Sequence, residues 1–167
     1  MRSLWSLVLL ACLLVTGQGE YLSRCEVAQQ LQQLGMDGYA GYSLANWVCT
    51  AFHESSFNTQ AMHYDSDGSI DFGIFQINSR YWCQYGNEKS SNACGIQCSE
   101  LLTNNLAVDA ACAKIVVSNS WNGMGAWVAW RLHCQGQDLS SYVEGCVLTF
   151  AWRPRRQEDS ENSNVFL

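Results

Sequence analysis

Nine cysteines in a chain of 167 residues constrain the fold more than any other feature of the sequence. Cysteines at this density are typical of small secreted proteins that are cross-linked by disulfides. Eight of them lie between residues 25 and 146. An even number in an oxidising compartment predicts four disulfides, although spacing alone leaves their pairing open. A zinc site is the alternative use of these cysteines. Cys94 and Cys98 form one C-x3-C pair, but there is no second closely spaced cysteine pair and no H-x3–5-H pair, so we expect no zinc.

The first 19 residues have the pattern of a secretory signal peptide. Arg2 provides a positive start, an almost unbroken apolar run covers residues 4–15, and Gly17-Gln18-Gly19 offers small residues for cleavage. We therefore expect residues 1–19 to be removed together with Cys12, the ninth cysteine, and the mature chain to be secreted. A membrane anchor is the alternative, but this run is too short to span a bilayer comfortably, so we expect no membrane span.

Composition and charge limit the kind of protein further. Hydrophobic residues make up 48% of the chain and charged residues 14%, which is enough apolar material for a folded core. Residues 20–148 hold five basic and twelve acidic residues, a net charge of −7, which argues against a nucleic-acid partner. We expect one monomeric domain over residues 20–148. Residues 149–167 lack cysteine and periodicity and predict a disordered extension, with a binding segment around Arg153, Arg155 and Arg156 as the alternative.

Two amphipathic helices are predicted in the first third of the domain. Ser23 and Glu26 form a capping box ahead of apolar residues at helical spacing over 27–34. Ser43 is a second candidate cap, and the apolar stripe over 44–52 follows it. This second helix is expected to end near Glu54 or Ser55.

A strand pattern follows these helices, and helical spacing then returns. Asp67-Gly68 predicts a tight turn, and the alternation of Ile70, Phe72 and Ile74 with other residues predicts a strand of a small hairpin. Residues 106–117 and 127–131 predict two further helices. Helices, then a hairpin, then helices indicate the α+β class.

Two carboxylates stand in unlike predicted environments. Glu54 lies at the C-terminal end of an apolar helix, where burial and the helix dipole both favour the protonated acid. Asp71 lies in mid-strand on the face opposite Ile70 and Phe72, where we expect it to stay ionised. One proton donor and one anion are what glycoside hydrolysis requires. On these residues alone, two ordinary surface acids are the alternative.

Three segments and the cysteine spacing resemble the c-type lysozyme family. The segments are residues 52–55, 67–79 and 122–130, and the resemblance covers residues 21–148. It implies a helical domain and a small antiparallel β domain with a cleft between them. It also implies the disulfides Cys25–Cys146, Cys49–Cys134, Cys83–Cys98 and Cys94–Cys112.

The same resemblance implies a site and an activity. Glu54 is expected as the general acid and Asp71 as the nucleophile or stabilising anion of a retaining muramidase, with the two carboxyls roughly 5–5.5 Å apart. The substrate would be peptidoglycan or a chitooligosaccharide, with no cofactor. The expected sugar-binding residues are Gln76, Asn78, Tyr81, Trp82, Ala126 (through its backbone) and Trp127, and Trp127 would also cover Glu54.

The sequence departs from the family pattern at several positions. His63 and Asp65 stand where the family usually places Asn, and a second carboxylate near Asp71 predicts a raised pKa for one of the two. Trp121 lies in a loop that is one residue longer than the family pattern. It either provides a stacking platform or only fills space in the loop. The segment 99–109 is poor in acids, so we expect no calcium.

In its negative charge the chain resembles the sperm lysozyme-like or digestive branches of the family, because antibacterial lysozymes are typically basic. Two alternatives to an active muramidase therefore remain on the sequence. One is a catalytically weak carbohydrate-binding protein, for example in gamete adhesion. The other is an α-lactalbumin-like regulator, a branch that lacks the acid, whereas Glu54 is present here.

Overall fold

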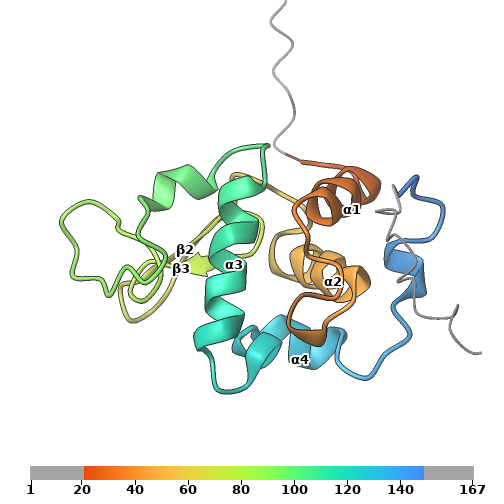
Figure 1. The fold of residues 1–167 in the computed structure, drawn as a ribbon. Helices are drawn as coiled ribbons and strands as arrows, with labels where there is room; N and C mark the ends of the chain where they lie inside the picture. Colours follow the sequence, from red (N-terminus) through yellow and green to blue (C-terminus); the bar gives the residue numbers. More distant parts are fainter. Residues whose placement is uncertain (1–20, 149–167) are drawn as a thin grey trace, which may run out of the picture.

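The computed structural model describes residues 21–148 and confirms the α+β class (Figure 1). The predicted signal peptide and the predicted extension at 149–167 lie outside the described residues. The α-helices are α1 (Arg24–Gln33), α2 (Leu44–Ser55), α3 (Ala107–Asn119) and α4 (Val128–His133). The 3-10 helices are η1 (Tyr39–Gly41), η2 (Cys98–Leu101), η3 (Gly123–Ala126) and η4 (Ser140–Tyr142). The strands are β1 (Met62–Tyr64), β2 (Ile70–Phe72) and β3 (Ile77–Asn78).

The caps of the first two helices differ from each other. The predicted capping box of α1 is present, because Ser23 Oγ accepts from the Glu26 N–H and the Glu26 carboxylate accepts from the Ser23 N–H at 2.8 Å. Ser43 occupies the N-cap position of α2, but its side chain makes no capping hydrogen bond. Instead Asp37, in the preceding loop, accepts from the Leu44 N–H at 2.9 Å. A residue seven positions earlier in the chain therefore satisfies one of the free N–H groups at this helix end.

The three strands form one antiparallel sheet in the order β1-β2-β3. The predicted alternation is confirmed in β2, where Ile70 and Phe72 are buried and Asp71 is half-buried. The predicted continuation of this strand to Ile74 is wrong, because the strand ends at Phe72 and the chain turns. Gly73 makes this turn with a positive φ of 73°, a conformation that residues with a Cβ rarely adopt.

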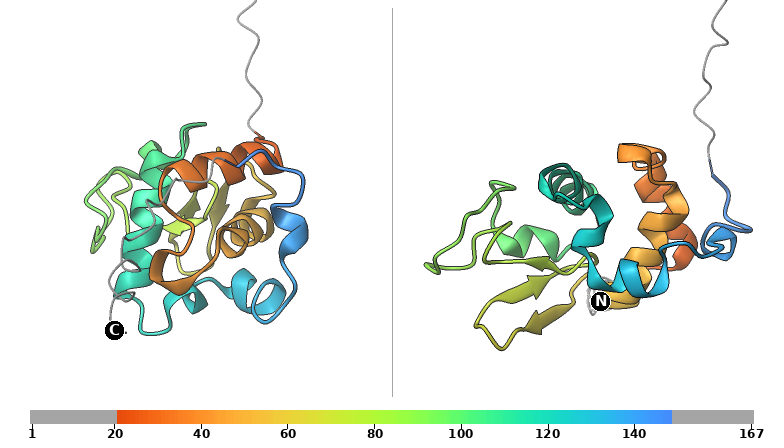
Figure 2. Two further views of the ribbon diagram at one scale, coloured as in Figure 1. Left: turned by 45° about the vertical axis from the view of Figure 1, so that its right-hand side comes forward. Right: turned by 90° about the horizontal axis from the view of Figure 1, so that it is seen from below.

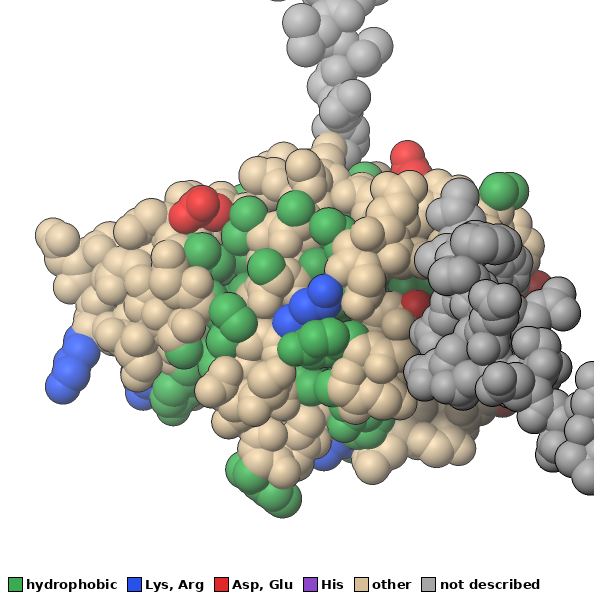
Figure 3. All heavy atoms as spheres, in the orientation of Figure 1, with side chains coloured by type: hydrophobic (Ala, Val, Ile, Leu, Met, Phe, Trp, Pro, Cys, Tyr) green, Lys and Arg blue, Asp and Glu red, His purple; other side chains and the backbone are tan. Residues whose placement is uncertain are grey.

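The helices and the sheet occupy two sides of the molecule, with α3 between them (Figures 1 and 2). The core continues from α1 and α2 through α3 to the sheet, and its large, fully buried side chains include Leu31, Trp47 and Phe72. Trp130, on α4, is also buried. Charged side chains are sparse on the face in Figure 3. No helix within residues 21–148 has the length and apolar character needed to cross a membrane.

Four disulfides connect the parts of this fold, with the pairing that the resemblance implied. Cys25–Cys146 joins α1 to the end of the described chain, and Cys49–Cys134 joins α2 to the residue after α4. Cys83–Cys98 and Cys94–Cys112 fasten the long loop after the sheet to η2 and α3. A domain of this size is stabilised by such links because they restrict the unfolded chain.

Candidate active site

A hollow of about 370 Å³ lies where the sheet side and the helical side meet. It brings together all eight site residues that the sequence predicted. The lining residues are Glu54, Asp71, Gln76, Ile77, Asn78, Tyr81, Trp82, Val116, Ala126, Trp127 and Val128. The prediction missed Ile77, Val116 and Val128. Ile77 and Val128 lie inside the segments that carry the family resemblance, whereas no sequence signal distinguishes Val116 from the rest of the apolar face of α3.

Glu54 is positioned by the last turn of α2. Burial, as the largest cause, and the charge of Asp71 together raise the pKa of its carboxyl to about 7, against a backbone hydrogen bond from Ala129 that lowers it. The chain leaves the helix through Ser56 and Phe57, which both have positive φ. Backbone held in this region costs on the order of 1–3 kcal/mol per residue and occurs preferentially at functional sites. The direction of the pKa shift is the one that the sequence predicted.

Asp71 is positioned at the centre of the sheet, opposite His63 on β1 and Asn78 on β3. Burial, as the largest cause, and the charges of Asp65 and Asp67 raise the pKa of its carboxyl to about 6. The predicted repulsion from Asp65 is therefore present, while the Asn78 hydrogen bond and His63 lower the pKa. With these values Asp71 loses its proton before Glu54 does, so it is largely ionised at pH 7.

Asn78 organises the acidic groups of the sheet. Its Nδ2 lies 2.8 Å from Asp71 Oδ1, 2.8 Å from Ser69 Oγ and 3.2 Å from Asp65 Oδ2. Its Oδ1 accepts from the Arg80 N–H at 2.9 Å, which fixes the orientation of the amide. The sequence predicted Asn78 only as a contact to sugar, whereas the structure gives it a second role, which is to orient and stabilise the Asp71 carboxylate.

Gln76 is also engaged within the protein. Its Nε2 donates to the carbonyl oxygen of Gly73 at 2.9 Å and to that of Ala61 at 3.2 Å. Ser55 Oγ donates to the Ile74 carbonyl oxygen at 2.9 Å, and thereby ties the end of α2 to the same turn. The turn after β2 is thus fastened to the helix that carries Glu54, which fixes the two carboxyls relative to each other.

Aromatic side chains form the walls of the hollow. Trp127 is only 6% exposed, and its Nε1 donates to the Phe75 carbonyl oxygen at 2.8 Å. Tyr81 is 53% exposed and Trp82 is half-buried. A broad ring with one free face can stack on the apolar face of a pyranose, and the buried ring of Trp127 helps to keep water away from this side of the hollow.

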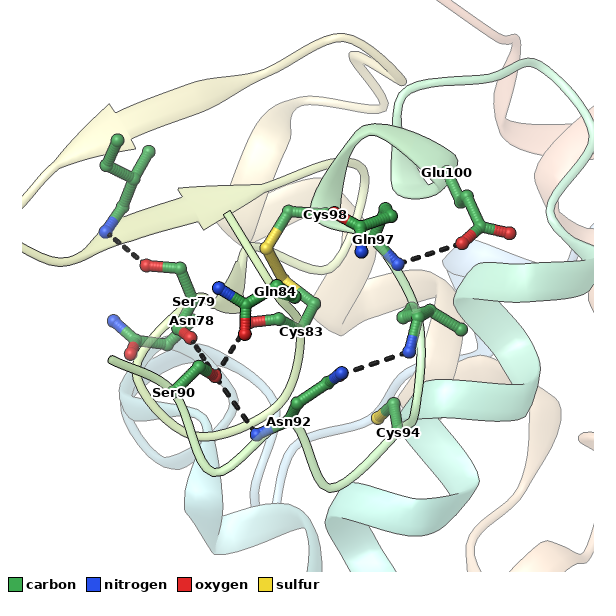
Figure 4. The surroundings of a disulfide bond; sticks show 12 residues. Asn78, Ser79, Cys83, Gln84, Ser90, Asn92, Cys94, Gln97, Cys98 and Glu100 are labelled. Atoms are coloured by element: carbon green, nitrogen blue, oxygen red, sulfur yellow. Dashed lines mark hydrogen bonds between the residues drawn. A yellow bond between two sulfur atoms is a disulfide. The ribbon is translucent and has the colours of Figure 1, made fainter. Parts of the chain in front are cut away.

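The loop after Trp82 is fastened by a disulfide and by hydrogen bonds (Figure 4). The Cys83–Cys98 disulfide begins at the next residue. Ser90 Oγ lies 2.6 Å from the Ser79 carbonyl oxygen and 2.8 Å from that of Cys83, so one hydroxyl bridges both ends of the segment that carries Tyr81 and Trp82. Further along this loop, backbone N–H groups donate to the carbonyl oxygens of Tyr81 and Trp82.

A metal-binding cluster is not found in the part of the chain that the structure describes, where no three His, Cys, Asp or Glu side chains are grouped to hold an ion. Asp109, which the sequence placed in the acid-poor segment, lies in α3 and is fully buried. Burial raises the pKa of Asp109 to about 8, so this acid is mainly protonated at neutral pH.

Known proteins resemble this chain over nearly all of the described domain. The family model for the C-type lysozyme/alpha-lactalbumin family matches residues 20–146. "Lysozyme C II" of Oncorhynchus mykiss is 57% identical over 140 residues, which are 83% of this chain and 96% of that protein. "Lysozyme C-1" of Anas platyrhynchos is 53% identical over 144 residues, which are 85% of this chain and 97% of that protein.

Solved structures give the same result. The crystal structure of lysozyme from Equus asinus aligns with a TM-score of 0.72 at 50% identity, over 75% of this chain and 98% of that one. Apo-type canine milk lysozyme aligns with a TM-score of 0.72 at 55% identity, with the same coverage. The implied fold is therefore confirmed, and the chain belongs to the C-type lysozyme/alpha-lactalbumin family.

Proposed function

We propose that this protein is a retaining muramidase that hydrolyses the β-1,4 link between N-acetylmuramic acid and N-acetylglucosamine in peptidoglycan. The observation that carries the proposal is the pair of carboxyls, Glu54 and Asp71, whose pKa values are both raised in one aromatic-lined hollow. The identity to named lysozymes C supports the activity, and the intact pair does not favour a regulator or a non-catalytic adhesion protein.

The two carboxyls take different roles in this proposal. Glu54 transfers its proton to the glycosidic oxygen as the bond from that oxygen to the anomeric carbon breaks. Asp71 attacks or stabilises the anomeric carbon from the opposite face. A water molecule then adds at that carbon from the face that the leaving oxygen vacated and gives a proton back to Glu54. Asp71 is released from the carbon as a carboxylate in the same step, so the configuration is retained. Lysozymes are the type case of this division of roles between two carboxyls.

The surroundings of each carboxyl suit its role. Burial keeps Glu54 protonated at a pH where an exposed glutamic acid is ionised. The Asn78 amide stabilises the anion of Asp71 by hydrogen bonding. The rings of Tyr81 and Trp82 would stack on sugar rings, and the buried ring of Trp127 would shield this side of the hollow from water. The backbone of Ala126, an exposed residue, would contact the N-acetyl group. We further propose that the protein acts as a secreted monomer after loss of residues 1–19.

The products of peptidoglycan digestion test this function. Purified peptidoglycan incubated with the mature chain should release fragments that end in reducing N-acetylmuramic acid, which mass spectrometry identifies. Proton NMR during early turnover of a chitooligosaccharide should show the β anomer first, because the mechanism retains configuration. Fragments that end in reducing N-acetylglucosamine would contradict the bond assignment, and an initial α anomer would contradict the role of Asp71.

A further inference from the structure

One row of side chains crosses the sheet and has Asp71 at its centre. In the register of the sheet, His63 on β1 lies opposite Asp71 on β2, and Asp71 lies opposite Asn78 on β3. Directly opposed residues of antiparallel strands project from the same face, with their Cβ atoms about 4.5–5.5 Å apart. His63 and Asn78 therefore flank the Asp71 carboxyl, and His63 is the flanking residue that can gain a positive charge.

The pairing of β1 with β2 continues past His63 to Asp65, because the Asp65 N–H donates to the Ser69 carbonyl oxygen at 2.9 Å. Residues 63 and 65 are two apart in an extended chain, so both side chains project from the face that carries Asp71. His63 Nε2 accordingly lies 3.9 Å from Asp65 Oδ1. The His63 side chain is 69% exposed on an edge strand, so it contributes little to the core and exchanges protons freely with water.

The groups around the Asp71 carboxyl have opposite effects on its proton. Burial is the largest cause that raises the pKa of Asp71, and the charges of Asp65 and Asp67 also raise it. The Asn78 hydrogen bond and the charge of His63 lower the same pKa. The hydrogen bond is present at every pH, whereas a histidine ordinarily gains its charge between about pH 8 and pH 5. His63 therefore supplies a stabilisation of the Asp71 anion that grows as the pH falls.

The other charged groups of this region do not respond in that way. Arg80 is paired with Asp67, with Nη1 2.9 Å from Oδ2, so its charge is constant and largely offset. Glu54 lines the hollow from α2, and with a pKa of about 7 it is mainly neutral over the acidic range.

We propose that His63 is a positioning residue whose imidazolium, formed as the pH falls, holds the Asp71 carboxyl in its ionised form and thereby extends hydrolysis to lower pH. The inference rests on the proposed function, in which Asp71 must be a carboxylate. The two groups titrate as a coupled pair, because the proton that joins the imidazole disfavours a proton on the carboxyl beside it. His63 acts through Asp71 in this proposal and requires no contact with the sugar.

The experiment compares kcat/KM for a neutral chitooligosaccharide at pH 4.5 and pH 7 in the parent and in His63→Asn. An opposite charge within about 4–6 Å lowers the pKa of a carboxyl by about 1–3, and water screens the exposed His63, so we expect the acidic limb to move up by about half a pH unit. The ratio of the two rates should then fall about threefold. His63→Lys, which stays charged, should restore the ratio. His133→Asn, at an exposed histidine outside the hollow, is the control and should leave it unchanged.

A second measurement reads the Asp71 carboxyl without turnover. Carboxyl 13C NMR of the free protein follows the titration of Asp71, and its midpoint should lie about half a pH unit higher in His63→Asn than in the parent. Circular dichroism at each pH controls for unfolding.

Each other result overturns the role of His63. Equal losses of kcat/KM at both pH values in His63→Asn would assign the residue to substrate contact or to folding. A loss that His63→Lys does not restore would show that charge is not the cause. Hydrolysis by the parent with an unmoved limb and an unmoved Asp71 midpoint would refute this inference alone. If the parent hydrolysed nothing at any pH, the proposed function would fail together with its extension to lower pH.

Discussion

The dependence of hydrolysis on pH follows directly from the two raised pKa values. The productive form has Asp71 ionised, with a pKa of about 6, and Glu54 protonated, with a pKa of about 7. From these values about 60% of the molecules are productive near pH 6.5. Two pH units away on either side the productive fraction falls to about 3%, so the rate should fall about twentyfold in each direction.

The assay is kcat/KM for a neutral chitooligosaccharide, because such a substrate does not titrate over this range. Circular dichroism at each pH controls for unfolding. A bell-shaped profile centred near pH 6.5 is expected. A rate at pH 8.5 equal to that at pH 6.5 would refute the reasoning, because a donor that has lost its proton cannot protonate the leaving oxygen.

Three further predictions concern single features of the chain. Asp65→Asn removes a charge that raises the pKa of Asp71, so the acidic limb of the profile should move to lower pH; an unmoved limb would contradict this coupling. Gly73→Ala should lower the free energy of unfolding in urea by about 2–5 kcal/mol, because a Cβ there has positive φ and collides with the Leu101 carbonyl oxygen. Gly68→Ala, with positive φ and open space, should cost only about 1–2 kcal/mol, and equal losses would show that the collision is not felt. Lysis of whole bacteria should be weak at 0.01 M salt, because the screening length is then about 30 Å and the anionic cell wall repels a domain with a charge of −7. Lysis should improve when moderate salt screens this repulsion. Lysis that is strong at low salt and falls steadily as the salt concentration rises would refute this.

Local sequence patterns predicted the elements that carry the two carboxyls. The apolar stripe of α2 gave the helix end at which Glu54 lies, and the alternation around Ile70 and Phe72 placed Asp71 on the opposite face. The family resemblance was needed to bring these two acids into one site. It was also needed for the disulfide pairing, because spacing alone cannot decide between connectivities.

The errors occur where contacts outside the local pattern of a helix or strand decide the outcome. Asp37 supplies the cap that the pattern assigned to Ser43. The strand stops before Ile74 because the chain must turn at Gly73 to meet α2 and α3. The helix over 106–117 was predicted, but only the packed structure shows that Asp109 within it is fully buried. Tertiary contacts of this kind override local preference and leave no periodic signal in the sequence.

The measurement that tests the central claim most directly is the hydrolysis rate of Glu54→Gln on a chitooligosaccharide. Glutamine keeps the shape of the side chain and removes the transferable proton, so the rate should fall at least about a hundredfold while the oligosaccharide still binds. Glu144→Gln, at an exposed glutamate outside the hollow, is the matched control and should hydrolyse like the parent. If Glu54→Gln cleaved the substrate as fast as the parent, Glu54 would not be the proton donor and the account of the site would be wrong.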